Sequence, residues 1–291
     1  MDFQMPVTSQ PLRHLLRDAE HYLQRHNVDE ARSVAELLVA RVCKLPRLQL
    51  LTVLDHALPE PAVEALRRGL RRVAKHEPVQ YVLGEWDFRT LTLRVDKRAL
   101  IPRPETELLV EWVLETRELC QRPAPRVADI GTGTGCILLS IASERPNAEC
   151  VAVDVSADAL ALARENAERL GLAGRVTLLR ADACSEFPPA SFDAIVSNPP
   201  YISTSEVAAL PPHIRDAEPR LALDGGADGF AFIRSIIAGA SWALRPGGWL
   251  FFEVGHDQGP ATRELMEEAG FQNTALRADY NRHPRFVRGM L

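Results

Sequence analysis

Apolar residues recur three or four positions apart through the first quarter of the chain, which is the spacing of an amphipathic helix. Asp29 separates the first two runs, and Pro59 and Pro61 precede the third. The apolar positions are Leu12, Leu15, Leu16, Ala19, Tyr22 and Leu23, then Ala31, Val34, Ala35, Leu38 and Val42, then Val63, Leu66, Leu70 and Val73. Thr8-Ser9 supplies a cap region before the first run. We therefore expect residues 1–77 to form three or four short helices packed as a small bundle.

The pattern changes after Glu85. Residues 86–88 and 91–95 alternate apolar and polar side chains on either side of Arg89-Thr90, which is typical of a β-hairpin. A segment marked by prolines, residues 101–107, then opens a helix that we expect to run to about Leu119.

From Arg126 onward, short apolar runs alternate with helical patterns. Strands are expected at 126–130, 150–154, 176–180, 192–197, 249–254, 271–276 and 285–289, with helices that include 157–170, 228–244 and 259–269. Such alternation produces a parallel sheet covered on both faces. The sequence thus predicts an α/β fold with a Rossmann-like, seven-stranded, mostly parallel sheet. A small all-helical N-terminal domain and a β-hairpin connector precede it, and we place the three parts at residues 1–77, 78–97 and 98–291.

The composition excludes several classes of protein. The chain has 291 residues, of which 46% are hydrophobic and 25% charged, as in ordinary globular proteins. Its five cysteines form no CxxC pair and its eight histidines show no metal-binding spacing, so we expect neither a disulfide framework nor a metal site. No apolar stretch is long enough to cross a membrane, and the first ten residues are unlike a signal peptide. We expect a cytoplasmic monomer with reduced thiols and no membrane partner.

Charge is distributed unevenly. Residues 1–77 hold 12 basic and 10 acidic residues, so with a net charge of −5 the remainder is near −7. Such a chain does not attract nucleic acid phosphates nonspecifically, and we expect no direct nucleic acid partner. Within the third helix, Arg67, Arg68, Arg71, Arg72 and Lys75 share one broad face. This face is either a solvated surface or a docking patch for an acidic or RNA-containing partner.

A glycine-rich loop follows the first strand of the alternating region. It consists of Gly131, Thr132, Gly133, Thr134 and Gly135, preceded by Asp129 and Ile130. Glycines allow positive φ angles and close approach of a ligand to the backbone. The third glycine comes one residue too early for a dinucleotide fingerprint, and no Gly-Lys-Ser/Thr of a P-loop is present. Because Asp129 can meet a cationic amine, the ligand need not be a pyrophosphate.

Further polar residues fall at the carboxyl ends of the expected strands. Asp154 ends the second strand, where a carboxylate can accept both ribose hydroxyl protons of an adenosine. The alternative is a helix cap shared with Ser156. Asp182, Ala183 and Asn198 end the next two strands. Ligands bind at this edge of such sheets, so these residues join Asp129 and the glycine loop as candidates for cofactor binding.

The tetrapeptide Asn198-Pro199-Pro200-Tyr201 directly follows the apolar run 192–197. Proline has no N–H, so this corner offers carbonyl oxygens and few donors, and each residue before a proline is held in extended geometry. A rigid group of acceptors beside a flat ring suits a planar NH2 group, either of an amide or of a nucleobase. Pro-Pro alone would equally fit a turn that ends a strand.

Together these motifs resemble a class I S-adenosylmethionine methyltransferase, and more closely the PrmC/HemK family of protein-(glutamine-N(5)) methyltransferases, which modify peptide chain release factors. The resemblance extends over most of the chain. It includes Glu77-Pro78-Val79-Gln80-Tyr81, residues 101–107, Glu218-Pro219 with Leu223, Gly226 and Gly229, and Glu253-Val254-Gly255.

The resemblance implies S-adenosyl-L-methionine as cofactor, with S-adenosyl-L-homocysteine as product. It assigns the glycine loop to the methionine part and Asp154 to the ribose. Asn198, Pro199, Pro200 and Tyr201 would grip the substrate, with Asn198, Pro199 and Tyr201 catalytic. After Asp182 that family often carries an aromatic residue beside the adenine, and this chain has Ala183 instead. The implied acceptor is the glutamine of the Gly-Gly-Gln motif of class 1 release factors, in support of translation termination.

Two alternatives remain open from the residues. An N(6)-adenine methyltransferase of DNA or RNA would use nearly the same corner, although the chain shows no basic groove or base-reading module. A non-enzymatic scaffold would bind the cofactor and dock a partner through its helical domain. Weaker candidates are Arg103, Thr106 and Glu107, which either border the site or act as helix caps and surface ion pairs. Glu253 would either line the crevice or bond the N–H groups of a neighbouring loop.

Overall fold

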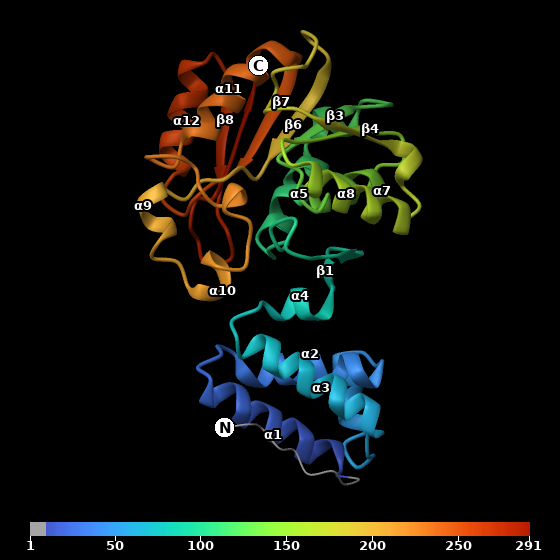
Figure 1. The fold of residues 1–291 in the computed structure, drawn as a ribbon. Coiled ribbons are helices and arrows are strands. Elements are labelled where there is room, and N and C mark those ends of the chain that lie inside the picture. The colour runs from blue at the N-terminus through green and yellow to red at the C-terminus, as the bar shows by residue number, and fades with distance from the viewer. Residues whose placement is uncertain (1–9) are drawn as a thin grey trace. The chain divides into compact units, whose positions relative to one another are not determined.

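The computed structural model describes residues 10–291, so the Thr8-Ser9 cap region lies outside the described residues. The chain divides into two compact units (Figure 1), Met1–Gly84 with Pro212–Ala217 and Glu85–Pro211 with Glu218–Leu291. The segment expected as a connector, residues 78–97, is shared between them: α4 (Val79–Leu83) belongs to the first unit and the hairpin to the second. No helix of the described residues is both long and apolar enough to span a bilayer.

The first unit is helical, as predicted. Besides α4 it contains α1 (Leu12–Arg25), α2 (Ala31–Cys43), the 3-10 helix η1 (Arg47–Thr52), α3 (Glu60–Val73) and α10 (Pro212–Arg215). Pro61 lies in the first turn of α3, where its missing N–H costs no helical hydrogen bond. Leu23, Leu38 and Leu70 are buried in the common core of α1, α2 and α3.

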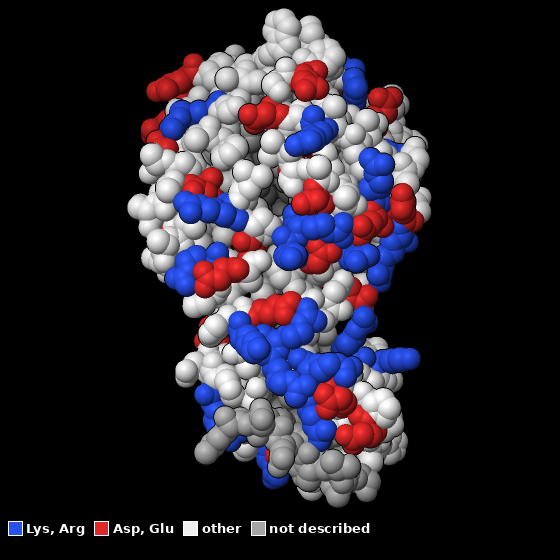
Figure 2. All heavy atoms as spheres, in the orientation of Figure 1, with Lys and Arg blue, Asp and Glu red and all other residues white. Residues whose placement is uncertain are grey.

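The basic face of α3 carries its own counterions. Arg67 pairs with Glu60 and Glu64, and Arg71 also pairs with Glu64. Arg72 pairs with Glu77. Figure 2 shows lysine and arginine side chains gathered over this face of the first unit, with acidic side chains beside them. The positive charge of the face is therefore partly compensated within the unit.

The second unit begins with the predicted hairpin. Strand β1 (Glu85–Phe88) pairs with β2 (Leu91–Arg94) in antiparallel register, and Arg89 turns the chain with a φ of 53°. Phe88 and Leu93 are buried in the same core as α5 (Thr106–Glu115). The hairpin is fixed to the unit by this apolar packing and by hydrogen bonds from its backbone to Glu107 of α5 and to Asn166.

The main sheet has seven strands in the order β5-β4-β3-β6-β7-β9-β8. Their bounds are β3 (Arg126–Ile130), β4 (Glu149–Asp154), β5 (Val176–Arg180), β6 (Phe192–Ser197), β7 (Leu244–Glu253), β8 (Gln272–Arg277) and β9 (Phe286–Met290). All neighbours are parallel except that β9 is antiparallel to β7 and β8. The predicted fold class, a mostly parallel seven-stranded sheet, is confirmed.

Helices cover both faces of this sheet (Figure 1). On one face lie α5, α7 (Cys136–Glu144) and α8 (Ala157–Arg169), packed on side chains such as Val127 and Phe251. On the other lie α11 (Ala231–Ala243) and α12 (Gly259–Glu268), packed on side chains such as Ile195 and Phe252. Successive strand residues point to opposite faces, so a central strand is buried on both sides, and every residue of β6 is buried.

Some elements differ from expectation. The helix expected to run to about Leu119 ends at Glu115, because Thr116 adopts extended geometry and bonds the Trp112 carbonyl through its hydroxyl. A separate short helix, α6 (Arg117–Cys120), follows. Strand β7 starts at Leu244, ahead of the expected position, by pairing Leu244 with Phe192 before a register shift. The short elements α9 (Thr204–Val207) and η3 (Arg220–Ala222) had no predicting pattern.

Candidate active site

A pocket opens at the carboxyl ends of the central strands of the second unit. Strands β3 and β6 are neighbours there. From β3 the sheet continues through β4 and β5 to one edge, and from β6 it continues through β7 toward the other edge. The Ser197 hydroxyl donates to the Ile130 carbonyl at 2.7 Å and ties the two strand ends together. The lining comes from the glycine loop, the ends of β4, β5 and β6, the segment before α5, and α11. This is the place where open α/β sheets bind ligands.

The glycine loop forms one wall of the pocket. Gly131, Gly133 and Gly135 have φ angles of 72°, 55° and 83°, values that favour glycine. Thr132, Gly133 and Thr134 line the pocket, and Gly135 lies beyond it as the residue before α7. A Cβ on Gly135 would lie 2.9 Å from Leu139 of that helix. The loop therefore presents its backbone to the cavity while its end is packed against α7.

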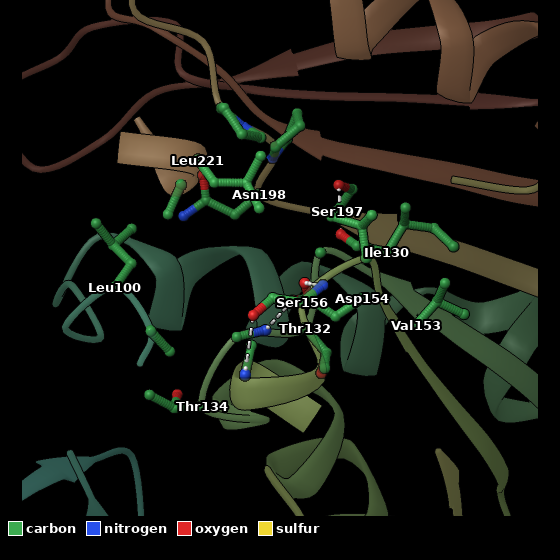
Figure 3. Close-up of a pocket in the computed structure, with 18 of the residues that line it drawn as sticks. Leu100, Ile130, Thr132, Thr134, Val153, Asp154, Ser156, Ser197, Asn198 and Leu221 are labelled. Atoms are coloured by element: carbon green, nitrogen blue, oxygen red, sulfur yellow. Dashed lines mark hydrogen bonds between the residues drawn. The ribbon is translucent and has the colours of Figure 1, made fainter. Parts of the chain in front are cut away.

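Asp154 faces this loop across the pocket edge (Figure 3). One carboxylate oxygen accepts the Gly133 N–H at 3.0 Å, and the other accepts the Ser156 N–H at 2.9 Å. Burial raises the pKa of this carboxyl. The Ser156 hydroxyl, not Asp154, caps α8 by accepting from the Ala159 N–H. Each oxygen of Asp154 keeps a lone pair, so the carboxylate can still accept hydroxyl groups from a ligand.

Asp129 lies beneath the loop and does not line the pocket. Its side chain is fully buried, and one oxygen accepts the Thr132 hydroxyl at 2.7 Å. The other oxygen has no hydrogen-bond partner within residues 10–291. Burial raises the pKa of this carboxyl to about 7. A positive charge bound close to Asp129 would favour the ionised form of its carboxyl.

The end of β5 supplies Asp182 and Ala183 to the lining, as the sequence suggested. Ala183 has a φ of 50°, an uncommon conformation for a residue with a Cβ. Phe232 and Ile236 of α11 also line the pocket. Sequence reasoning missed both, because the pattern of α11 showed an apolar face but not which part of it would be left open.

Asn198, Pro199 and Pro200 line the pocket at the end of β6. The Asn198 side-chain NH2 donates to the Thr106 hydroxyl at 3.2 Å. Within residues 10–291 the protein donates no hydrogen bond to the Asn198 side-chain oxygen or to the Pro199 carbonyl oxygen. Two acceptors on a stiff backbone are therefore available to a ligand. Figure 3 shows Asn198 on the side of the cavity away from Thr132 and Asp154.

Tyr201, the fourth residue of the motif, does not line the pocket. Its hydroxyl accepts from the Arg285 guanidinium at 2.7 Å, and its carbonyl accepts from the Gln258 side chain at 2.9 Å. Burial raises the pKa of its phenol. A Cβ on Gly229 would lie 2.4 Å from the Tyr201 carbonyl oxygen, so glycine is required for this close approach. In this structure Tyr201 anchors the corner from behind.

Of the weaker candidates, some line the pocket and others do not. Arg103 and Thr106 line the pocket, and the Arg103 guanidinium donates to buried Glu218. Glu107 instead accepts the Arg89 N–H at 3.0 Å, away from the lining. Glu253 takes neither expected role: it does not line the pocket, and it accepts the Thr106 hydroxyl at 2.6 Å rather than loop N–H groups.

Comparisons with known proteins agree with this architecture. Residues 104–228 match the methyltransferase small domain, and residues 14–84 match the PrmC N-terminal domain. The release factor glutamine methyltransferase of Moorella thermoacetica is 42% identical over 270 residues, which cover 92% of this chain and 94% of the relative. That of Geobacter sulfurreducens is 40% identical over 283 residues and 96% of each chain. This chain belongs to the release factor glutamine methyltransferase family.

The fold is shared more widely than the family. The solved structure of the hMettl16 catalytic domain in complex with MAT2A 3'UTR hairpin 6 has a TM-score of 0.56 and 16% identity, over 79% of this chain and 81% of that one. Similarity at this level of identity concerns the fold of a methyltransferase and not its acceptor.

The cofactor of this methyltransferase is S-adenosyl-L-methionine, and the pocket residues fit it. The group carries a sulfonium, an ammonium and two ribose hydroxyls. The unpaired buried oxygen of Asp129 suits a cationic neighbour, and the open lone pairs of Asp154 suit hydroxyls. Apolar side chains such as Val155, Leu221 and Phe232 offer surface to a flat base. Within residues 10–291 no cluster of His, Cys, Asp and Glu could hold a metal ion.

Proposed function

We propose that this methyltransferase transfers a methyl group from S-adenosyl-L-methionine to the side-chain amide nitrogen of a glutamine. The acceptor is the glutamine of the Gly-Gly-Gln motif of class 1 peptide chain release factors, and the modification supports translation termination. The family names of the full-length relatives support this acceptor.

One observation carries the proposal. The Asn198 side-chain oxygen and the Pro199 carbonyl oxygen are unpartnered acceptors in the same pocket as the hydroxyl-binding carboxylate of Asp154. A primary amide has two N–H groups on one nitrogen, so two adjacent acceptors can hold that nitrogen in a fixed position. The same two acceptors repel the oxygen of an amide, so this pair also distinguishes the amide nitrogen from the amide oxygen.

The bound cofactor supplies an electrophilic methyl group on a positively charged sulfur. The chain has to place a weak nucleophile in line with that carbon, and fixed positioning of this kind is worth up to roughly 7–11 kcal/mol. As the new N–C bond forms, positive charge grows on the amide nitrogen. The oxygens of Asn198 and Pro199 stabilise that charge more in the transition state than in the ground state. The extra proton leaves the nitrogen after transfer, so no strong general base is required.

The remaining site residues are assigned to binding. Gly131 to Gly135 hold the methionine part of the cofactor, with Asp129 beneath it, and Asp154 holds the ribose. Asp182 and Ala183 lie beside the base, where Phe232 adds an aromatic edge. Pro200 completes the substrate corner. Tyr201 acts in this proposal by holding the corner in place rather than as a wall against the amide, since its ring lies outside the lining.

The first unit is proposed to hold the release factor while the pocket takes one side chain. A match to the PrmC N-terminal domain over residues 14–84 supports this division of labour. We further propose that the protein acts in the cytoplasm, as a monomer, without direct contact to nucleic acid. The rival acceptor, adenine of DNA or RNA, gains no support from relatives that align over nearly the whole chain.

The test is methyl transfer to a purified class 1 release factor. The protein is incubated with the release factor and with cofactor labelled in its methyl group. The release factor is then digested, and its peptides are analysed by mass spectrometry. We expect a mass increase of one methylene on the peptide that contains Gly-Gly-Gln, located on the glutamine side chain. A release factor with that glutamine replaced by glutamate is the matched control. Label on nucleic acid but not on this glutamine would overturn the proposal.

A further inference from the structure

Three distant segments meet behind the Asn198 corner in a buried row of polar groups. Glu253, at the end of β7, is 1% exposed, and Thr106, at the start of α5, is 2% exposed. The Thr106 hydroxyl donates to Glu253 at 2.6 Å and accepts from the Asn198 NH2 at 3.2 Å. Glu253 does not line the pocket. Its hydrogen bond to Thr106 connects it to Asn198, which does line the pocket.

The number of hydrogens that these groups can donate determines which of them donates and which accepts in each hydrogen bond. An ionised carboxylate can only accept hydrogen bonds, and a hydroxyl has a single hydrogen to give. When Glu253 takes the hydrogen of Thr106, the Thr106 oxygen can only accept from its other neighbour. Asn198 must then turn its NH2 toward Thr106. Its carbonyl oxygen is left to face the ligand.

We propose that Glu253, acting through Thr106, is the positioning residue that fixes the orientation of the Asn198 carboxamide. This inference rests on the proposed function, since only an acceptor oxygen facing the pocket can hold the N–H of a glutamine. The reversed carboxamide would present NH2 to NH2, a repulsive contact that excludes the productive pose. Glu253 is thus a specificity element for an amide nitrogen although it touches neither substrate nor cofactor.

Several charged and titratable groups surround Glu253. Arg285, just before β9, has a guanidinium nitrogen 3.6 Å from the second oxygen of Glu253 and also donates to Tyr201. In the segment before α5, the charge of Arg103 lowers the pKa of Glu253 and that of Glu105 raises it. The charge of Glu253 in turn raises the pKa of Cys136 at the start of α7. Burial nevertheless dominates and raises the pKa of Glu253 to about 7.

The orientation is therefore expected to depend on pH. Above about pH 7 Glu253 is ionised and only accepts, so the carboxamide is locked. Below that pH its protonated form no longer requires the Thr106 hydrogen, and Thr106 is free to donate to the Asn198 oxygen. The locked population, and with it turnover, should increase as pH rises through about 7.

The orientation can be observed without any reaction. In a nitrogen-15 spectrum of the full-length protein, the side-chain NH2 signals of Asn198 are assigned by their loss in Asn198→Asp. We expect protected, well-separated NH2 protons above the transition and loss of that protection in Thr106→Val. In Glu253→Gln the pH dependence of these signals should disappear. Signals of Asn198 that respond to neither substitution would overturn the proposal.

Kinetics provide the second readout. In Thr106→Val we expect kcat to fall on the order of 100-fold, as for a misplaced reactive group, with KM for the release factor and cofactor affinity nearly unchanged. Thr106→Ser keeps the hydroxyl and should recover most of this loss. In Glu253→Gln the rise of kcat with pH should flatten. Thr92→Val on the exposed hairpin and Glu264→Gln on the exposed face of α12 make the same chemical changes away from the site.

The outcomes separate the two claims. If the wild-type protein methylates no release factor, the proposed function fails, while the NH2 signals still test the orientation of Asn198. If the wild-type protein is active but Thr106→Ser is as impaired as Thr106→Val, the hydroxyl plays no part and the positioning role is wrong. If Thr106→Val fails to fold, Glu253→Gln and the wild-type pH titration of the NH2 signals still decide the proposal.

Discussion

The two sides of the pocket are held in different ways. On the cofactor side, Asp154 is fixed by two backbone N–H groups. One belongs to Gly133 of the glycine loop and the other to Ser156, two residues along the chain. On the substrate side, Asn198 is fixed by the side chain of Thr106, which lies 92 residues away in sequence and is held in turn by Glu253. The first side is built from backbone and the second from side chains.

This difference determines which substitutions each side of the pocket should tolerate. Among the substitutions only proline removes a backbone N–H donor, so the cofactor side should survive most other side-chain changes around Asp154. A side-chain relay loses its function when any member is removed, because the next member is left without its partner in a buried place. Specificity for an amide nitrogen should therefore be lost more easily than cofactor binding.

The largest expected effect follows from removing the end of the relay. In Asn198→Ala we expect kcat to fall about 100- to 1000-fold, because one of the two oxygens that stabilise the developing charge is lost. Cofactor affinity, measured by calorimetry, should remain close to that of wild type. Asn147→Ala, at an exposed position before β4, is the matched control. Near-normal turnover in Asn198→Ala would remove this residue from the mechanism.

The corresponding change on the cofactor side should have the opposite profile. In Asp154→Ala we expect cofactor affinity to fall roughly 10- to 100-fold, the range for hydrogen bonds to a charged group. At saturating cofactor, turnover should recover most of its wild-type value. Titration calorimetry together with initial rates at several cofactor concentrations checks both parts. A loss of kcat as large as that in Asn198→Ala would contradict the division between the two sides.

The same difference explains what the sequence could predict. Gly131 to Gly135, Asp154 and Asn198 follow directly from strand ends, and the parallel sheet brings those ends to one edge whatever the details of packing. The relay could not be predicted, because the pairing of Thr106 with Glu253 depends on how α5 packs on the sheet. Glu253 was a candidate for a different role, and Tyr201 was expected in the pocket but faces Arg285.

The errors in secondary structure have a similar origin. The apolar pattern of α5 continues past Thr116, but the hydroxyl of that residue bonds the Trp112 carbonyl and accepts from Arg288, a residue of β9. Local propensity favoured a continuous helix, and a contact from another part of the chain ended it. The short elements after β6 likewise depend on contacts of the loop and not on periodicity.

A smaller effect concerns the unpaired carboxyl beneath the glycine loop. The pKa of the Asp129 carboxyl is about 7 in the folded protein and lies above its ordinary value of 3.8, so the folded protein binds a proton that the unfolded chain releases. Stability of the cofactor-free protein should therefore decrease as pH rises from about 6 to about 8, by on the order of 1 kcal/mol from this group. Asp129→Asn should remove that part of the slope in urea denaturation curves. An unchanged slope would place the proton elsewhere.

The smallest expected effect is at the end of β5. Ala183 has a left-handed φ of 50°, which costs a residue with a Cβ more than it costs glycine. In Ala183→Gly we expect a gain in unfolding free energy of about 0.5–1 kcal/mol, after the entropic cost of glycine is subtracted. Thermal unfolding of the cofactor-free protein measures it. Destabilisation would mean that the methyl group packs more usefully than the backbone strain costs.

The central claim is that the Asn198 corner grips a glutamine nitrogen. A crystal structure of the protein with S-adenosyl-L-homocysteine and a Gly-Gly-Gln peptide tests it most directly. We predict that the glutamine side-chain nitrogen lies about 2.7–3.2 Å from both the Asn198 side-chain oxygen and the Pro199 carbonyl oxygen, with the Asn198 NH2 still on Thr106. A complex in which Asn198 turns its NH2 to the ligand, or in which the glutamine lies outside this corner, would contradict the account.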